Sequence, residues 1–219
     1  MKEIRPYQIL DWDRFIKRAH PRLKQWFDAE AKYLRDNPLP GRVLEWGCGT
    51  GRVLEVLTTS AKQVIGIDHD RYMVKRARAA NKHNHNVTVC LEEGLALLFP
   101  NGFFDGVVCF GNTFGNLGRD KLKALNEMKR VCRKGGRILI SVYNEKALES
   151  RLASYILDEL PHSRVTSQGT VYTSQGFTSE QFRKKRLVGI LEKGGCVKPD
   201  YNIRSLTPIS YLVNITNNT

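Results

Sequence analysis

The sequence predicts an α/β fold in which a mostly parallel sheet is covered by helices on both faces. Strand-like and helix-like runs alternate along most of the chain, which is the order that parallel sheets require. The 219 residues are 41% hydrophobic, enough for the core of one domain but cramped for two. Closely spaced glycines follow the first strand-like run. We therefore expect a single α/β domain over residues 1–219.

The N-terminal segment has apolar residues at helical spacing from Trp12 to about Arg35. Pro21 is expected to kink or divide this helix, because a proline removes a backbone donor and clashes with the preceding turn. The stretch NPLPG at residues 37–41 ends it. The first 40 residues therefore predict a helical segment ahead of the first strand.

The later elements follow from apolar runs, helical spacing and turn residues. Gly135 and Gly136 are expected to cap a helix and turn the chain into the next strand, and Ser179 is a candidate N-cap. The polar residues 162–178 predict a hairpin or a flexible loop. Strands are expected at 42–46, 63–68, 86–91, 103–110, 136–143, 196–206 and 208–215. Helices are expected at 51–60, 71–83, 119–133, 145–160 and 179–193.

The net charge is +13, and residues 119–144 alone carry eight basic and two acidic side chains. Basic residues would cover the outer face of the helix over 119–133, with Arg130, Arg133 and Lys134 at its C-terminal end. The charge leaves two interpretations open, a solvated basic face or a patch that binds nucleic acid. The apolar stripe expected on the inner face comprises Leu122, Leu125, Met128, Val131 and Cys132.

Several classes of protein are not expected from the composition. No run approaches the roughly 18 apolar residues that cross a bilayer, and the N-terminus lacks the apolar stretch of a signal peptide. The five cysteines form no CxxC pair, so we expect them to be unpaired and to pack as small buried hydrophobic side chains. Unpaired cysteines are typical of a protein in the reducing cytoplasm. Neither HExxH nor a cysteine–histidine cluster is present, so no metal is expected.

The most informative segment is VLEWGCGTGR at residues 43–52, where a strand leads into three glycines and then a helix. Glycines without a Cβ let the backbone pass close to a ligand. A nicotinamide-binding loop would need GxGxxG with glycine at position 52, which is Arg52. The spacing found is GxGxG, preceded by Glu45. Asp68 ends the second strand 21 residues after Gly47, where a carboxylate can accept both hydroxyls of an adenosine ribose.

Four segments in succession resemble the motifs of the class I S-adenosylmethionine-dependent methyltransferases. They are VLEWGCGTGRVLEVL, VIGIDHD, EEGLALLFPNGFFDGVV and EMKRVCRKGGRILIS, and the resemblance covers roughly residues 41–143. It implies a Rossmann-like seven-stranded sheet of order 3-2-1-4-5-7-6 with an antiparallel last strand. The implied cofactor is S-adenosyl-L-methionine, with S-adenosyl-L-homocysteine as product. The expected division is a helical lid (1–40), a cofactor-binding core (41–144), a substrate-selecting insertion (145–178), and a closing helix and strands (179–219).

The same resemblance assigns cofactor contacts along the chain. It implies that the glycine loop packs against the methionine part, Asp68 holds the ribose, and His69 and Met73 flank the adenine. An acidic residue after the third strand would meet the adenine region, and Phe110 would line the site of the sulfonium methyl, although Met73 and Phe110 could equally be core residues. The expected cofactor-binding set is Glu45, Gly47, Cys48, Gly49, Gly51, Asp68, His69, Met73, Glu92, Glu93 and Phe110.

Catalytic residues are harder to assign, because a sulfonium already activates its methyl group and the protein mainly has to align the reactants. Asn112 could orient an acceptor amine, or it could serve only turn chemistry beside glycines. Tyr143 could bind substrate through its ring or hydroxyl. His20 and His162 are candidate proton acceptors, each with an ordinary structural or solvated alternative.

The acceptor remains open at this stage. GNTFGNL at residues 111–117 resembles the corresponding segment of glycine and sarcosine methyltransferase-like members, which favours a small or amine acceptor. SVYN at residues 141–144 departs from that pattern. We expect methyl transfer to nitrogen or oxygen of a small molecule or peptide. The alternatives are an RNA methyltransferase and a cofactor-binding subunit without catalysis, and the oligomeric state is not predicted.

Overall fold

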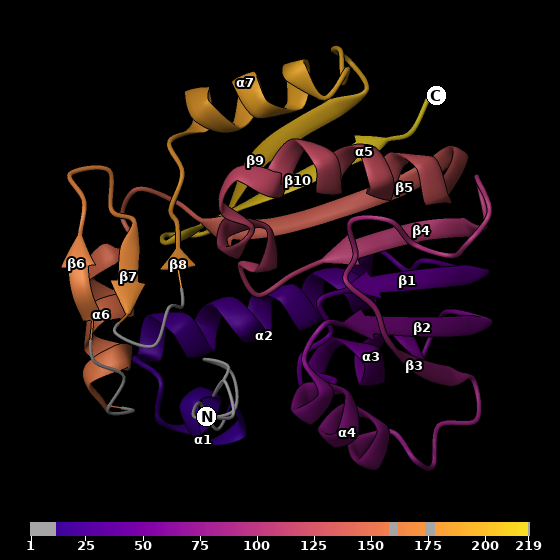
Figure 1. Cartoon of the computed structure of the whole chain (residues 1–219), viewed down its shortest axis with the longest axis horizontal. Coiled ribbons are helices and arrows are strands. Elements are labelled where there is room, and N and C mark those ends of the chain that lie inside the picture. The colour runs from indigo at the N-terminus through magenta and orange to yellow at the C-terminus, as the bar shows by residue number, and fades with distance from the viewer. Residues whose placement is uncertain (1–11, 158–161, 174–177, 219) are drawn as a thin grey trace, which may run out of the picture.

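The computed structural model describes residues 12–157, 162–173 and 178–218. Its centre is a seven-stranded sheet of order β3-β2-β1-β4-β5-β10-β9 (Figure 1). Neighbouring strands from β3 to β5 pair in parallel, and β10 runs antiparallel to both β5 and β9. The strands are β1 (Arg42–Trp46), β2 (Gln63–Asp68), β3 (Val87–Leu91), β4 (Phe104–Cys109), β5 (Cys132–Tyr143), β9 (Tyr201–Thr207) and β10 (Ser210–Thr216).

This sheet confirms the expected fold. Numbered within the sheet alone, its strands have the order 3-2-1-4-5-7-6. The labels differ because three further strands, which form a separate small sheet, precede β9 and β10 in the chain. These are β6 (His162–Val165), β7 (Val171–Thr173) and β8 (Thr178–Ser179), so the polar segment forms a hairpin followed by one short strand.

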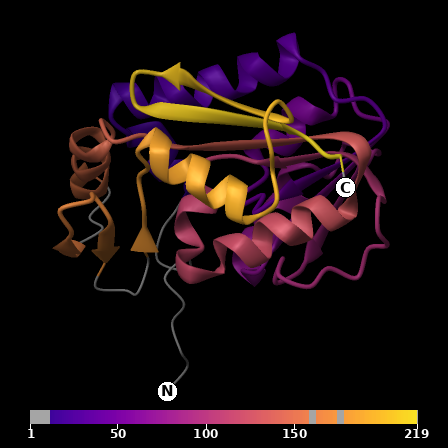
Figure 2. The ribbon, with the colours of Figure 1, turned by 90° about the horizontal axis from the view of Figure 1, so that it is seen from above.

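Helices cover both faces of the large sheet because its strand residues alternate between two apolar cores. Leu44 and Ile65 belong to the core beneath α5 and α7, whereas the neighbouring Val43 and Val64 belong to the core beneath α2, α3 and α4 (Figure 2). No helix in the described ranges is long and apolar enough to cross a bilayer. The helices are α1 (Trp12–Arg18), α2 (Pro21–Asp36), α3 (Arg52–Leu57), α4 (Arg71–Ala80), α5 (Lys121–Val131), α6 (Leu148–Leu157) and α7 (Lys184–Lys193).

Pro21 divides the N-terminal helical segment as expected, and it occupies the start of α2. There its missing N–H costs nothing, since the first turn of a helix has no partner for that group. His20 caps the helix, because its Nδ1 accepts from the backbone N–H of Arg22 at 3.2 Å. The proline thus creates a break between α1 and α2.

Three local expectations were wrong. The glycines Gly135 and Gly136 do not cap α5, because this helix already ends at Val131 with Cys132 as its C-cap. The carbonyl of Cys132 accepts from the Asn217 side chain at 2.7 Å. Both glycines belong to β5 and exchange backbone hydrogen bonds with Asn217. Ser179 lies in β8 and does not cap α7, whose N-cap is Arg183. Leu122 is 37% exposed, so it lies outside the buried stripe of α5.

The small sheet is attached to the rest of the fold by Arg151 of α6, which has no exposed surface. Its guanidinium donates to the carbonyls of Gly169 at 2.9 Å and Ser179 at 2.7 Å, and to the Gln181 side chain at 3.1 Å. The guanidinium also lies 4.7 Å from the centre of the Tyr143 ring at the end of β5. One buried side chain therefore joins α6, the small sheet and the central sheet.

Two glycine substitutions test why glycine stands where it does. Gly189 lies inside α7 with nothing within 4 Å of an added Cβ, so Gly189→Ala should raise the free energy of unfolding by about 0.5–1 kcal/mol. Gly51, the N-cap of α3, has φ +95°, and an added Cβ would lie 2.6 Å from Asn81 Nδ2. Gly51→Ala should lower that free energy by at least ~1 kcal/mol. Urea unfolding measures both, and shifts of the same sign would contradict the assignment.

Candidate functional site

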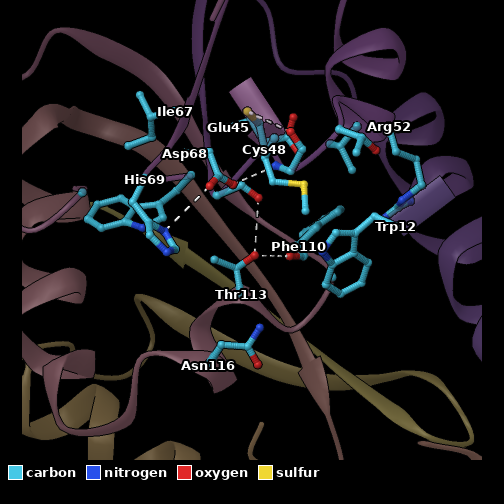
Figure 3. A pocket seen from close by; sticks show the side chains of 18 of the residues that line it. Trp12, Glu45, Cys48, Arg52, Ile67, Asp68, His69, Phe110, Thr113 and Asn116 are labelled. Atoms are coloured by element: carbon cyan, nitrogen blue, oxygen red, sulfur yellow. Dashed lines mark hydrogen bonds and ion pairs between the residues drawn. The ribbon is translucent and has the colours of Figure 1, made fainter. Parts of the chain in front are cut away.

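A cavity of about 1080 Å³, counted to its open mouth, lies at the carboxyl ends of β1, β2 and β4 (Figure 3). Open α/β sheets bind ligands at this edge. The wall comes from the loop after β1, the ends of β2, β3 and β4, and the N-terminal helices, which contribute Trp12, Ile16 and Phe27. Most of the residues that the sequence singled out meet here.

The glycine loop is held against the end of β2. The backbone N–H groups of Gly47 and Cys48 both donate to the carbonyl of Ile67, at 2.8 and 2.9 Å. Gly47 has φ +72° and Gly49 has φ +53°, a region that residues with a side chain rarely adopt. A Cβ added at Gly49 would meet no atom within 4 Å. The backbone at Gly49 is therefore open to a ligand in the cavity.

Asp68 ends β2 on the cavity wall with an 11% exposed side chain. Its Oδ2 accepts from the N–H of Gly49 at 2.9 Å, and its Oδ1 accepts from the N–H of Asp70 at 3.0 Å. Burial raises the pKa of this carboxyl above its ordinary value, while the two backbone donors act in the opposite direction. A carboxylate can accept about four hydrogen bonds, so Asp68 retains capacity for the two hydroxyls of a diol.

Glu45 is the buried acid of β1, and it also lines the cavity. Its Oε2 has no hydrogen-bond partner within the described structure, which is uncommon for a buried oxygen. Burial raises the pKa of Glu45 well above its ordinary value, and the Arg52 guanidinium partly opposes that shift. A cationic group bound in the cavity would supply the partner that this carboxylate lacks.

An acid on the buried face of α2 connects the site to the N-terminal helices. Glu30 has no exposed surface, and it accepts from the Gly111 N–H at 2.9 Å and pairs with Arg52 at 2.5 Å. The same guanidinium lies 4.8 Å from the centre of the Phe27 ring. Sequence reasoning missed this pair, although Glu30 interrupts the apolar stripe of Leu23, Trp26, Phe27, Tyr33 and Leu34. An acid at such a position signals a buried partner.

The first helix lies over the cavity and is attached to its rim. Asp13 accepts from the Thr50 hydroxyl at 3.0 Å and forms an ion pair with Arg76 of α4. Trp12 and Ile16, on either side of Asp13, line the cavity. In Figure 3 the Trp12 indole lies toward Phe110 and Arg52, away from Asp68 and His69. The sequence predicted a helical lid here, but it predicted no individual contact for Trp12, Asp13 or Ile16.

The structure brings together ten of the eleven expected cofactor residues on the wall of this one cavity. The exception is Gly51, which begins α3 and packs against Ala77 and Asn81 of α4 instead. Its positive φ explains the glycine without any ligand contact. The cavity also includes Thr113 and Asn116, which follow Asn112 in the chain.

The catalytic candidates Asn112, Tyr143 and His20 do not line the cavity. The Asn112 amide donates to the Ser179 hydroxyl at 3.1 Å, and its oxygen accepts from the N–H of Tyr143 at 3.1 Å, so it joins β8 to the end of β5. Tyr143 is buried with its ring 4.6 Å from that of Trp26, and His20 caps α2. The side chain of His162 lies outside the described residues.

Part of the chain is similar in sequence to known methyltransferases. Residues 43–136 match a family model described as a methyltransferase domain. The ubiquinone/menaquinone biosynthesis C-methyltransferase UbiE of Geobacter sp. (strain M21) is 32% identical over 115 residues, which make up 49% of this chain and 48% of that protein. The chain therefore spans about half the length of that curated relative.

Two solved structures share the fold. The PH0226 protein of Pyrococcus horikoshii OT3 has a TM-score of 0.69 at 16% identity, over 96% of this chain and 97% of that one. The 1,6-didemethyltoxoflavin-N1-methyltransferase of Burkholderia thailandensis, solved with 1,6-didemethyltoxoflavin and S-adenosylhomocysteine, has a TM-score of 0.65 at 16% identity, over 89% of this chain and 78% of that one.

The succession of motifs and the sheet order resemble those of the class I S-adenosylmethionine-dependent methyltransferases, and residues 43–136 match a methyltransferase domain. The cofactor of this class is S-adenosylmethionine, and the residues of the cavity fit it. The unpartnered oxygen of Glu45 can meet a positive charge, the open backbone at Gly49 leaves room, and Asp68 can accept from a ribose diol. In the part of the chain that the structure describes, no cluster of three or more potential metal ligands occurs.

The buried carboxyl of Glu45 generates a pH-dependent prediction. The pKa of Glu45 is raised in the folded state, so at any pH above the ordinary glutamate pKa of 4.5 the cost of burying the charge lowers the free energy of unfolding. Glu45→Gln should therefore melt at a higher temperature than the wild type at pH 7, and this difference should shrink as the pH falls toward 4.5. Thermal melts across this range test it, with Glu55→Gln on the exposed side of α3 as control. A difference that stays constant with pH would contradict burial as the cause.

Proposed function

We propose that this chain transfers a methyl group from S-adenosylmethionine to a nitrogen or oxygen of a small-molecule acceptor. One observation carries the proposal: the buried carboxyl of Glu45 and the partly buried carboxyl of Asp68 flank a glycine loop whose backbone is open to the same cavity. A ligand with a positive charge and a diol can pair with both carboxyls, the charge with Glu45 and the diol with Asp68. S-adenosylmethionine has an amino group, a sulfonium and a ribose diol.

Different residues of the cavity wall bind different parts of the cofactor. Asp68 accepts from the ribose hydroxyls, and the loop from Gly47 to Gly49 packs against the methionine part. Glu45 offsets the positive charge at that end. The adenine lies between the elements that follow β2 and β3, whose side chains lining the cavity are His69, Met73, Glu92 and Glu93.

The cofactor supplies an electrophilic methyl group, so the protein has to orient it and exclude water. Phe110 presents an apolar ring away from His69, with Trp12 of α1 beside it, and Phe27 also lines the cavity. Thr113 and Asn116 provide polar groups on the same wall. We propose that residues 1–40 act as a lid over this end, and that residues 145–178 select the acceptor.

Two observations support a small acceptor. GNTFGNL resembles the segment of glycine and sarcosine methyltransferase-like members. One structural relative is named for methylating N1 of a small heterocycle. Two of the basic residues that could form a patch for RNA are paired within the protein, Arg130 with Glu127 and Arg133 with Asp105. We therefore do not propose an RNA substrate.

Substitution of Asp68 tests the proposed cofactor site. Loss of two charge-assisted hydrogen bonds in Asp68→Ala should cost about 2–4 kcal/mol, or roughly 30- to 1,000-fold in S-adenosylhomocysteine affinity. Asp68→Asn should lose less, because an amide oxygen can still accept. Titration calorimetry measures both. Because Asp68 also accepts from Gly49 and Asp70, some loss of thermal stability is expected in Asp68→Ala.

The decisive comparison for the activity uses the full chain with a labelled methyl donor and fractions of small amines, peptides and RNA. Transfer to a small-molecule fraction is expected, and it should fall in Asp68→Ala in parallel with cofactor affinity. Normal cofactor binding by Asp68→Ala together with an early melt would show that the residue is only structural. Transfer to RNA alone would replace the proposed acceptor.

The contacts of Asp13 generate a prediction for the lid. Asp13→Asn removes the charge of the pair with Arg76 and retains an oxygen that can accept from Thr50. Partly exposed pairs are worth about 0.2–1 kcal/mol, so S-adenosylhomocysteine should dissociate up to about fivefold faster. Stopped-flow displacement measures this rate. Asp28→Asn, on an exposed position of α2, is the matched control, and equal rates in the two variants would argue against a lid.

A further inference from the structure

A second cavity adjoins the first at the carboxyl edge of the sheet. It is an open groove of about 1270 Å³, and Asn116 and Leu117 line both spaces. One wall is the pair of 3-10 helices after β4, at Thr113–Asn116 and Gly118–Asp120. The other wall comes from the small sheet and the start of α7. A molecule in this groove would reach the cofactor cavity at Asn116.

The groove differs chemically from the cofactor cavity. Its far wall presents mainly hydroxyl and amide side chains from residues 166–170 and 178, and only Tyr172 adds a ring. The wall of the cofactor cavity instead includes the aromatic rings of Trp12, Phe27 and Phe110. The groove is therefore suited to a polar ligand that can form many hydrogen bonds.

Two guanidinium groups, those of Arg119 and Arg186, line the groove. The Glu180 carboxylate, 8% exposed, pairs with both Lys121 and Arg186, so one negative charge faces two positive charges. Arg186 is 40% exposed and lines the groove. Arg119 lines the opposite wall, is exposed, and has no ion pair within the described part of the chain. Glu180 and Asp120 balance the two guanidinium groups of the lining, and the buried Lys121 behind Glu180 leaves these five residues with one net positive charge.

The far wall is held in place before any ligand arrives. Arg151 donates to the carbonyls of Gly169 and Ser179, which neighbour lining residues of the groove. The N–H of Glu180 donates to the carbonyl of Gly115 at 3.0 Å and so joins the two walls. A preformed wall lowers the entropic cost of binding.

We infer that this groove binds the methyl acceptor, and that the acceptor carries a carboxylate or phosphate group held between Arg119 and Arg186. This inference rests on the proposed function, because it makes the groove the acceptor side of the same reaction centre. Guanidinium groups present paired N–H donors that match the oxygens of either anion. The atom that is methylated would then lie toward Asn116 and the cofactor cavity.

Inorganic phosphate and acetate serve as probes of the groove. The full chain, saturated with S-adenosylhomocysteine, is titrated with each anion at constant ionic strength while backbone amide resonances are followed. Phosphate should shift the amides of residues 116–120 and 178–186 with a dissociation constant on the order of 1 mM. Arg119→Gln and Arg186→Gln should each weaken this binding roughly tenfold. Lys185→Gln removes the same charge from an exposed position of α7 outside the groove lining, and it should change the binding little.

The outcomes separate the inference from the proposed function. Tighter binding of phosphate than of acetate indicates a phosphorylated acceptor, and the reverse indicates a carboxylate, so both support the inference. Absence of shifts in the groove, or equal weakening in Lys185→Gln, would overturn it. Failure of S-adenosylhomocysteine to bind would instead refute the proposed cofactor site, and the titration of the free chain would still test the groove. Arg119→Gln keeps the test valid if Arg186→Gln unfolds, because Arg119 is exposed.

Discussion

The site depends on the attachment of the loop after β1 to the end of β2. The consecutive N–H groups of Gly47, Cys48 and Gly49 are all directed at that strand end, two to the carbonyl of Ile67 and one to the carboxylate of Asp68. These bonds turn the chain across the edge of the sheet and leave the backbone of Gly49 facing open space. The same carboxylate thus shapes the loop and lines the cavity, so the two roles of Asp68 are physically linked.

Buried charge is the second constraint on the site. Glu30 and Arg52 neutralise one another and connect α2 to the loop after β4 and to the start of α3. Glu45 has no comparable partner for its Oε2. An uncompensated buried acid destabilises the fold, and such groups concentrate where a ligand can satisfy them. Unlike Glu30, Glu45 therefore has an unpartnered carboxylate oxygen beside the cavity that it lines.

The groove beside Asn116 is built by parts of the chain that are distant in sequence. Arg151, Asn112 and Glu180 hold the small sheet, the loop after β4 and the start of α7 together. The cofactor side instead uses short loops directly after consecutive strands. This difference lets the polar groove vary without disturbing the glycine loop, as expected for folds whose sites are placed on loops of a rigid scaffold.

By itself the sequence determined the sheet, its order through the family resemblance, and residues after strand ends that meet on the wall of one cavity, such as Asp68. These features depend on local spacing, because strand alternation and a glycine turn are encoded within a few residues. Only the tertiary structure decided the roles of Gly51, Asn112 and Tyr143, and it revealed the partners of Glu30. Each of these contacts joins distant segments, for example Asn112 with Ser179, 67 residues apart. Local patterns specify where a chain turns, whereas the partner of a buried polar group depends on how whole elements pack.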